Sequence, residues 1–288
     1  MSVACVVVTY NRKKLLLNTI NSLLKQTEKI NEIIIIDNAS TDGTEELLRR
    51  NRYLEINGIN YLKMSTNLGG AGGFSFGIKY AYEKGYDWIW VMDDDGVPAE
   101  NCLHELLKHK SVSEFLAPLV INIQNHNELS FPYNSIYDRR KIEDQFKHSG
   151  IIRGFACPFN GILISRKLVK QIGFPLKDMF IWGDESEYFN RAISYGFIPT
   201  TIMSAIHFHP KDRLQIYKTL FGRKKVVYPK NQLRKYCYYR NHAYIIRKYK
   251  GINSILKWLI LYTYFFVITR KFDLKGLMFF YTSGIDGI

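Results

Sequence analysis

The sequence has few of the features that mark secreted, zinc-binding or membrane-spanning proteins. Its 288 residues include only four cysteines, which are widely scattered and form no CxxC pair. This spacing argues against a zinc site and favours reduced thiols in the cytoplasm. The chain does not open with a basic segment, an apolar run and a cleavage site, so we expect no signal peptide.

Acidic residues are scarce in the last quarter of the chain. Residues 210–288 hold 17 Lys+Arg against 3 Asp+Glu, whereas residues 1–209 hold 23 of each. The whole net charge of +14 therefore lies in the C-terminal region, where tyrosine and phenylalanine also become frequent. We predict a boundary near Pro210, with one domain over 1–210 and a basic, helical region over 211–288.

A long apolar span is also missing from that region. Trp258–Thr269 contains twelve uncharged residues, fewer than the roughly 20 that a spanning helix needs. A basic, aromatic helix suits an interfacial anchor on anionic lipid. Interleaved bases and aromatics over 230–250 also suit nucleic-acid binding, and a helical subdomain with solvated basic faces is a third interpretation.

The most informative stretch is Trp88–Met92 followed by Asp93, Asp94 and Asp95. The apolar run predicts a buried strand that carries three carboxylates to a sheet edge. Adjacent carboxylates repel one another, and burial also disfavours their charged forms unless a cation compensates. Oxygen ligands of this kind suit Mg²⁺ or Mn²⁺.

The first hundred residues alternate between strand and helix patterns. Strands are expected at 3–9, 32–37, 59–64 and 88–92, with a helix over 13–26 and another running to about Arg50 that Thr41 or Asp42 would cap. Such alternation predicts βαβ units and a parallel sheet. Ligands bind such sheets at the carboxyl ends of their strands, where Thr9, Asp37, Asn67 and the Asp93–Asp95 triplet would meet.

Residues 67–74 form a glycine-rich segment, expected as a loop before a helix that ends near Gly85. Its glycines, Gly69 and Gly70 among them, would let the backbone approach a ligand closely. The segment is not a GxGxxG in the first βα unit, which argues against a nicotinamide enzyme.

Several segments together resemble family 2 glycosyltransferases of the GT-A fold. They are, in order, VVTYNR (7–12), IIDNASTDGT (35–44), NLGGAGGF (67–74), MDDDG (92–96), FNGILIS (159–165), FIWGDESEYFNR (180–191) and HFH (207–209). The resemblance covers about residues 3–210. Its closest match is the galactofuranosyltransferase and rhamnosyltransferase branch.

The resemblance implies a Rossmann-like GT-A domain with a mostly parallel sheet, and a nucleotide-sugar donor. Asp93 and Asp95 would bind the metal, with Asp93 and Asp94 near the ribose or sugar. Asp37 is placed to accept hydrogen bonds from the uracil or ribose, or else to cap a helix. Thr9 and Asn11 would lie beside the base, and Asn67, Gly69 and Gly70 beside the donor.

Inverting transfer needs a base that takes the proton from the acceptor hydroxyl. The family's catalytic aspartate position falls on Glu185, with Asp184 as its rival; a helix N-terminus also favours acids there. Trp182, Glu187 and His209 are expected at the acceptor site. A histidine of the HFH segment completes the metal site in the family, and His207 is favoured over His209.

The expected function is inverting transfer of a sugar to a cell-surface polysaccharide or a polyprenyl-diphosphate-linked glycan. The preferred donor is UDP-galactofuranose, which would supply galactofuranose. UDP-galactopyranose and dTDP-rhamnose are alternative donors. The expected place is the cytoplasmic face of the plasma membrane, without nucleic acid as a partner. Rival hypotheses are a haloacid-dehalogenase-like phosphatase, for which Asp93-Asp94-Asp95-Gly96 also fits, and a non-catalytic module that binds nucleotide sugar or nucleic acid.

Overall fold

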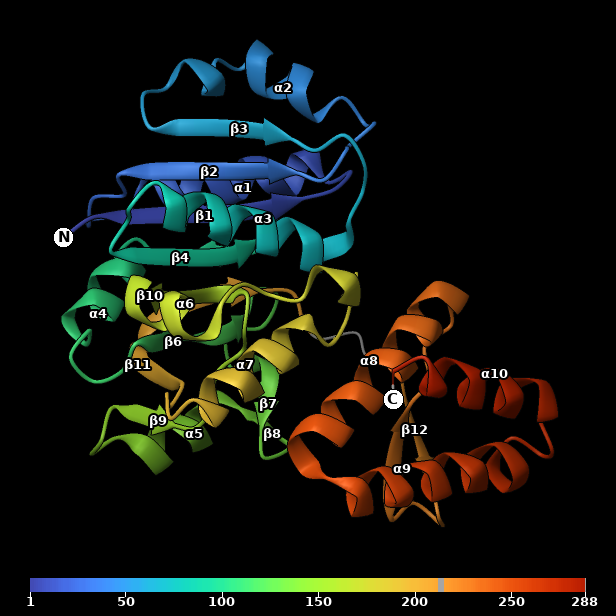
Figure 1. Cartoon of the computed structure of the whole chain (residues 1–288). Coiled ribbons are helices and arrows are strands. Elements are labelled where there is room, and N and C mark those ends of the chain that lie inside the picture. The colour runs from blue at the N-terminus through green and yellow to red at the C-terminus, as the bar shows by residue number, and fades with distance from the viewer. Residues whose placement is uncertain (212–214, 288) are drawn as a thin grey trace. The chain divides into compact units, whose positions relative to one another are not determined.

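The computed structural model describes residues 1–211 and 215–287. The chain divides into two compact units (Figure 1). The first comprises residues 1–177 and 188–212. The second comprises residues 178–187 and 213–288. A short stretch ahead of Tyr188 therefore belongs with the C-terminal region rather than with its neighbours in sequence.

A parallel half-sheet forms the beginning of the first unit, as the alternating pattern predicts. Its strands lie in the order β3-β2-β1-β4 and pair in parallel. They are β1 (Val3–Thr9), β2 (Glu32–Asp37), β3 (Ile59–Lys63) and β4 (Trp88–Asp93). Every residue of β1 and β2 is buried, which explains why their sequences are continuous apolar runs.

The sheet continues beyond β4 with strands of mixed direction. β10 pairs antiparallel with both β4 and β6, and β11 runs parallel to β6. These strands are β5 (Val97–Pro98), β6 (Phe115–Asn122), β10 (Asn160–Ser165) and β11 (Thr200–His209). Three short strands extend this half, namely β7 (Glu128–Tyr133), β8 (Ile136–Asp138) and β9 (Ile151–Arg153).

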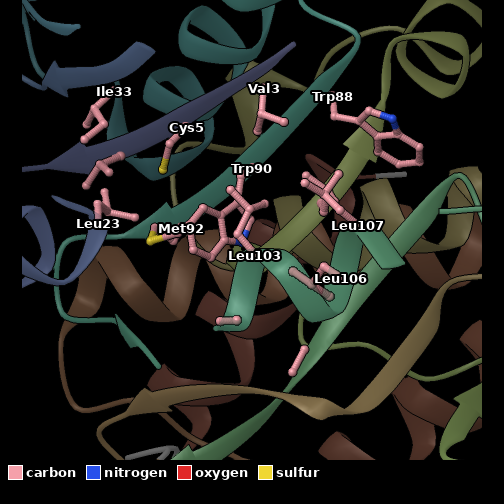
Figure 2. Packing of buried hydrophobic residues seen from close by; sticks show 14 of the residues in the cluster. Val3, Cys5, Leu23, Ile33, Trp88, Trp90, Met92, Leu103, Leu106 and Leu107 are labelled. Carbon is pink, nitrogen blue, oxygen red and sulfur yellow. The ribbon is translucent and has the colours of Figure 1, made fainter. Parts of the chain in front are cut away.

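Helices cover both faces of the sheet. One face is covered by α1 (Lys13–Leu24), α2 (Thr44–Arg50) and α4 (Cys102–Lys108). Figure 2 shows part of this core, where Trp90 and Met92 of β4 lie among side chains that include Leu103 and Leu106. The other face is covered by α3 (Gly69–Glu83), α6 (Arg166–Ile172) and the later part of α7 (Asp184–Ser194). The remaining pieces are η1 (Tyr53–Glu55), α5 (Arg139–Phe146) and η2 (Lys177–Met179).

The predicted cap of α2 is wrong. Gly43 is the N-cap residue, with φ of 83°, and it has no side chain with which to cap the helix. The Asp42 carboxylate accepts a hydrogen bond from the hydroxyl of Thr44, the first residue of α2, at 2.5 Å, and another from the backbone N–H of Lys13, at 3.2 Å. The side chain that was expected to cap α2 therefore ties the start of α1 to this loop.

The second unit has an aromatic core of its own. It contains a hairpin of β12 (Ile216–Thr219) and β13 (Lys224–Val227), followed by α8 (Gln232–Lys250), α9 (Ile252–Tyr264), a π-helical turn η3 (Phe265–Thr269) and α10 (Leu274–Ile285). Tyr239, Tyr262 and Phe280 pack at its centre, with the Tyr262 and Phe280 rings stacked 4.7 Å apart. Many aromatic residues of the basic region therefore build a core.

The apolar helix is longer than the twelve-residue run expected from the sequence: among the described residues, Ile252–Thr269 is long and apolar enough to span a bilayer by length and composition. Helices in the cores of water-soluble proteins meet the same criteria. Within it, Trp258, Tyr262, Phe265 and Phe266 are buried in the aromatic core. These four rings stabilise the second unit by packing together.

Candidate functional site

The acidic triplet lies at the carboxyl end of β4, beside the ends of β1 and β2. The strand register pairs Val8 with Asp93 and Thr9 with Asp37, so the sheet brings these polar residues to one edge as predicted. Asp93, Asp95 and His209 each offer a ligand atom, and these atoms lie within 4.8 Å of one another. His209 Nε2 is 3.1 Å from Asp95 Oδ1.

Arg12, at the turn after β1, also pairs with the triplet. Its Nη1 lies 3.1 Å from Asp94 Oδ1 and 3.1 Å from Asp95 Oδ2. Asp94 is buried and also accepts a hydrogen bond from the Thr9 hydroxyl at 2.7 Å. Thr9 and Asp94, both expected to face the donor, therefore form a hydrogen bond with each other. Asp93 and Asp95 are the two carboxylates of the triplet that remain as candidate metal ligands.

The charges of the triplet are unequally compensated. Burial, followed by repulsion from Asp95 and Asp94, raises the pKa of Asp93 to about 8. Burial also raises the pKa of Asp94 to about 6, although Arg12 and Thr9 oppose the change. Against the effect of burial, His209 and Arg12 hold the pKa of Asp95 below its usual value. His209 and Arg12 thus compensate the negative charge of Asp95, but they compensate that of Asp93 only in part.

This donor set fits a hard divalent cation. Two carboxylates and an imidazole form a mixed oxygen and nitrogen site that accepts Mn²⁺. A bound cation would place a compensating positive charge beside the Asp93 carboxylate. Its binding would displace the proton that this carboxylate retains because its pKa is raised. Asp93, Asp95 and His209 are therefore the residues that would hold the metal.

His209 occupies the position expected for His207. His207 is fully buried on β11, and neither of its ring nitrogens has a hydrogen-bond partner among the described residues. Its ring packs against two glycines: a Cβ on Gly96 would lie 2.3 Å from Nε2, and a Cβ on Gly161 2.8 Å from Nδ1. His207 thus supports the turn that follows the triplet, and glycine is required on both sides of it.

The buried imidazole of His207 makes a contribution to stability that is lost in acid. Burial lowers the pKa of His207 to about 3, from 6.5, so the unfolded chain binds a proton that the folded protein excludes. Its contribution to stability is complete above pH 6.5 and is lost as the pH falls toward 3. At pH 5 the loss is about 2 kcal/mol.

The variant His207→Gln cannot titrate, so its change in stability from pH 7 to pH 5 should be more favourable than that of the wild type by about 2 kcal/mol. The measurement is the free energy of unfolding by urea at pH 7 and pH 5, with a chelator present. The exposed His148 provides the matched control, since His148→Gln should leave the slope as in the wild type. An unchanged slope in His207→Gln would contradict the assignment.

Asp37 and Asn11 organise the neighbouring loops. Asp37 is fully buried and accepts hydrogen bonds from the Ser40 backbone N–H, at 2.7 Å, and from the Tyr61 hydroxyl. Asn11 has a left-handed φ of 54°, and its side-chain oxygen accepts from the Thr41 backbone N–H at 2.8 Å. These side chains join the loops after β1 and β2, so their expected contacts with the nucleotide stay predictions.

The predicted glycine-rich loop is mostly helix. α3 begins at Gly69, whose N–H donates to the Asn67 side chain at 2.8 Å. A Cβ on Gly73 would lie 2.6 Å from Val8, and one on Gly77 would lie 2.4 Å from Val6. These glycines let α3 pack directly on β1. Gly70 differs, since a Cβ there would contact only the Phe74 ring, at 3.9 Å.

The segment before α7 is held within the second unit by Asn241 of α8. The Asn241 amide group donates to the backbone carbonyls of Met179, Ile181 and Trp182, at 2.8, 3.1 and 2.6 Å. The backbone there is strained, because Phe180 and Trp182 have φ of 63° and 59°. Three carbonyl contacts from one buried amide stabilise this unusual conformation.

The side chain of Trp182 also packs on α8. The Arg234 guanidinium lies 5.6 Å from its ring centre, and Tyr238 meets the ring edge to face at 6.4 Å. The indole expected at the acceptor site is therefore oriented by neighbours in the second unit.

Three acidic residues lie in the first turn of α7. Asp184 is 4% exposed, whereas Glu185 is partly exposed and its carboxylate accepts a hydrogen bond from the Gly183 N–H at 2.9 Å. Glu187 is fully buried; it accepts from the Tyr249 hydroxyl at 2.7 Å and lies 3.5 Å from Lys248 Nζ. Glu187, expected at the acceptor site, thus ties α7 to α8 inside the second unit.

Sequence reasoning missed Arg12 and Tyr61 as residues that position the site. Arg12 lies inside a quoted motif, but its partners Asp94 and Asp95 are far away in sequence. Tyr61 lies in β3, two residues before Lys63, and the strand register sets Lys63 opposite Asp37. Nothing else in the sequence indicates that Tyr61 contacts Asp37. These partnerships arise only from the folded arrangement.

Known proteins resemble the chain in sequence. The profile of Glycosyl transferase family 2 matches residues 4–173. A galactofuranosyltransferase of Mycolicibacterium smegmatis is 30% identical over 286 residues, which cover 96% of this chain and 92% of that protein. The likeness thus includes both units.

Solved structures resemble the fold at lower identity. GalNAc-T7 with UDP, GalNAc and Mn²⁺ superposes with a TM-score of 0.57 at 18% identity, over 73% of this chain and 43% of that one. A mannosyltransferase from Pyrobaculum calidifontis with GDP-Man and Mn²⁺ gives a TM-score of 0.56 at 14% identity, over 98% of this chain and 73% of that one. Both likenesses concern the fold, which is the GT-A fold predicted from the motifs.

Proposed function

The chain belongs to glycosyltransferase family 2, and we propose that it transfers galactofuranose from UDP-galactofuranose to a hydroxyl of a glycan acceptor with inversion. The observation that supports this sugar is the 30% identity to a galactofuranosyltransferase over nearly all of both chains. The GT-A fold and the use of a nucleotide-sugar donor follow from the family. The sugar, the acceptor and the metal dependence are our proposal.

The donor half of the reaction is assigned to the first unit. A divalent cation held by Asp93, Asp95 and His209 would offset the charge that develops on the nucleoside diphosphate as it leaves. His209 and Arg12 hold the pKa of Asp95 below its usual value, and Arg12 pairs with its Oδ2 atom at 3.1 Å. Thr9 and Arg12 fix Asp94, so that the turn presents Asp93 and Asp95 in one arrangement.

The acceptor half is assigned to the first turn of α7. Glu185 is the proposed base, because its carboxylate is partly exposed whereas those of Asp184 and Glu187 are buried. The Gly183 N–H donates a hydrogen bond to one of its oxygens, and the side chain lies in the first turn of the helix. The proposed acceptor is a cell-surface polysaccharide precursor, such as a polyprenyl-diphosphate-linked glycan.

A thermal-shift experiment tests the donor assignment. We expect UDP with Mn²⁺ to raise the melting temperature, and UDP with a chelator to do so much less. At 100 times the dissociation constant, the ligand should stabilise the protein by about 2.7 kcal/mol. Stabilisation by dTDP instead would support the rhamnosyltransferase alternative, and no response to UDP, dTDP or GDP would contradict a nucleotide-sugar site.

Turnover then separates the donors and the reaction classes. UDP release from UDP-galactofuranose should exceed that from UDP-galactopyranose when a soluble acceptor is present. Release of inorganic phosphate from simple phosphoesters, without any sugar transfer, would instead support the phosphatase hypothesis that the Asp-Asp-Asp-Gly pattern leaves open.

A further inference from the structure

The β12–β13 hairpin of the second unit ends in an exposed aromatic side chain. Phe221 is 97% exposed. Its turn consists of Leu220, Phe221 and Gly222, all with left-handed φ values of 49°, 54° and 84°. The cations beside this turn are also exposed; they are Lys218, Arg223, Lys224 and Lys225. A phenylalanine held outward by strained backbone among cations contributes nothing to the core.

A second turn, between η3 and α10, has the same character. Phe272 is 69% exposed and has a left-handed φ of 63°. The apolar residues on either side of this turn, Ile268 and Leu274, are 53% and 62% exposed. Its exposed cations are Arg270, Lys271 and Lys275. Aromatic, aliphatic and basic groups are therefore presented together here as well.

The fold joins these two turns, although they lie about fifty residues apart in sequence. The hydroxyls of Thr219 and Thr269 lie 2.7 Å from each other, at the bases of the two turns. We call the combined residues 218–225 and 268–275 the basic aromatic tip. Its only acidic residue, Asp273, accepts a hydrogen bond from the Gly276 N–H at 2.9 Å and lies 3.7 Å from Arg270 Nε. The tip thus carries six cations in addition to Arg270, which pairs with its one acid.

We propose that the basic aromatic tip docks the protein on an anionic lipid bilayer. Phe221 and Phe272 would enter the interfacial region, while the lysines and arginines contact anionic headgroups. An anionic bilayer fits both features of the tip, because it offers an apolar layer to the two phenylalanines and negative charge to the cations. Its surface is wide enough to contact both turns. The proposal deepens the proposed function, since a polyprenyl-linked acceptor would lie in the same bilayer.

The lipid contact is thereby assigned to two turns instead of the aromatic part of the apolar run, residues 258–266. Trp258, Tyr262, Phe265 and Phe266 are packed in the core of the second unit. Exposing them to lipid would require that core to open, whereas the tip is exposed without any rearrangement.

Sedimentation with vesicles tests the proposal on the full chain. Vesicles of phosphatidylcholine with 30 mol% phosphatidylglycerol are compared with pure phosphatidylcholine at about 150 mM salt, near physiological ionic strength. We expect the wild type to bind the anionic vesicles and to bind the neutral ones much more weakly. The double variant Phe221→Ser and Phe272→Ser should weaken binding by about a hundredfold, roughly tenfold for each ring.

A charge variant tests the electrostatic half. Lys224→Gln, Lys225→Gln and Lys271→Gln together should weaken binding by about a hundredfold, near fivefold for each cation. The matched control replaces three exposed lysines of the first unit, Lys14, Lys25 and Lys29, by glutamine. It should bind the anionic vesicles about a hundredfold more tightly than the charge variant of the tip. All substituted side chains are exposed, and circular dichroism checks that each variant is folded.

The outcomes separate this proposal from the proposed function. UDP release from UDP-galactofuranose in the presence of a soluble acceptor should be unchanged in the tip variants. Equal binding of wild type and tip variants to anionic vesicles would overturn the lipid surface while leaving the transferase proposal intact. A wild type that binds RNA in a salt-sensitive way but does not bind vesicles, together with loss of the RNA binding in the tip variants, would overturn the lipid proposal in favour of nucleic acid.

Discussion

Replacing Asp95 by alanine will reduce kcat/KM for glycosyl transfer by about a thousandfold, which corresponds to about 4 kcal/mol of lost transition-state stabilisation. Asp95 is the residue that joins the candidate metal group to the rest of the site. It lies 3.1 Å from His209 and 3.1 Å from Arg12. Its removal leaves Asp93 and His209 as a two-ligand site.

The measurement combines turnover with binding of Mn²⁺ alone. Asp95→Ala should weaken Mn²⁺ binding and abolish the metal-dependent stabilisation by UDP, while the melting temperature of the metal-free protein changes little because Arg12 still pairs with Asp94. Asp87→Ala provides the matched control, since Asp87 immediately precedes the opposite end of β4 and its carboxylate accepts from the Ser2 N–H. Full activity of Asp95→Ala in a chelator would overturn the mechanism.

The sequence predicts the parallel half-sheet because each strand there carries its own signal. Continuous β-branched runs such as those of β1 and β2 are buried on both faces, so their boundaries at Thr9 and Asp37 can be read from composition alone. The register that follows brings the carboxyl ends together without further information. The ordered motifs then identify the family, as the profile match over residues 4–173 confirms.

The choice between His207 and His209 could not be made in this way. Both lie on β11 two residues apart, so alternation places them on the same side of the strand. What separates them is the closeness of Gly96 and Gly161 to the His207 ring, which fills the space that a ligand would need. Those contacts come from β10 and from the turn after β4, and a local pattern does not contain them.

The glycines of α3 were misread for a related reason. A run such as Gly69-Gly70-Ala71-Gly72-Gly73 has low helix propensity, so propensity alone favours a loop. The helix forms because Gly73 and Gly77 leave room for β1, and tertiary packing compensates for the poor propensity. Similarly, the 178–187 segment joins the second unit through Asn241, which no spacing rule would indicate.

Replacing Glu185 by glutamine will lower kcat by about a hundredfold to ten thousandfold, the range that general-base catalysis contributes. Glutamine keeps the length of the side chain and can still accept the hydrogen bond of the Gly183 N–H through its amide oxygen. The helix end is therefore preserved, and the variant removes only the ability to take a proton. Metal-dependent UDP binding, assigned to the first unit, should be unchanged.

Asp184→Asn distinguishes the rival base. Asp184 is 4% exposed, so a loss of its charge should act mainly on stability and should leave kcat within about tenfold of the wild type, well short of the loss expected for a base. The decisive comparison is kcat of the two variants under saturating donor and acceptor, with thermal stability measured in parallel. A large loss of kcat in Asp184→Asn together with a nearly normal Glu185→Gln would exchange the roles. In that case the buried carboxylate would be the base, and the partly exposed one would serve only to cap α7.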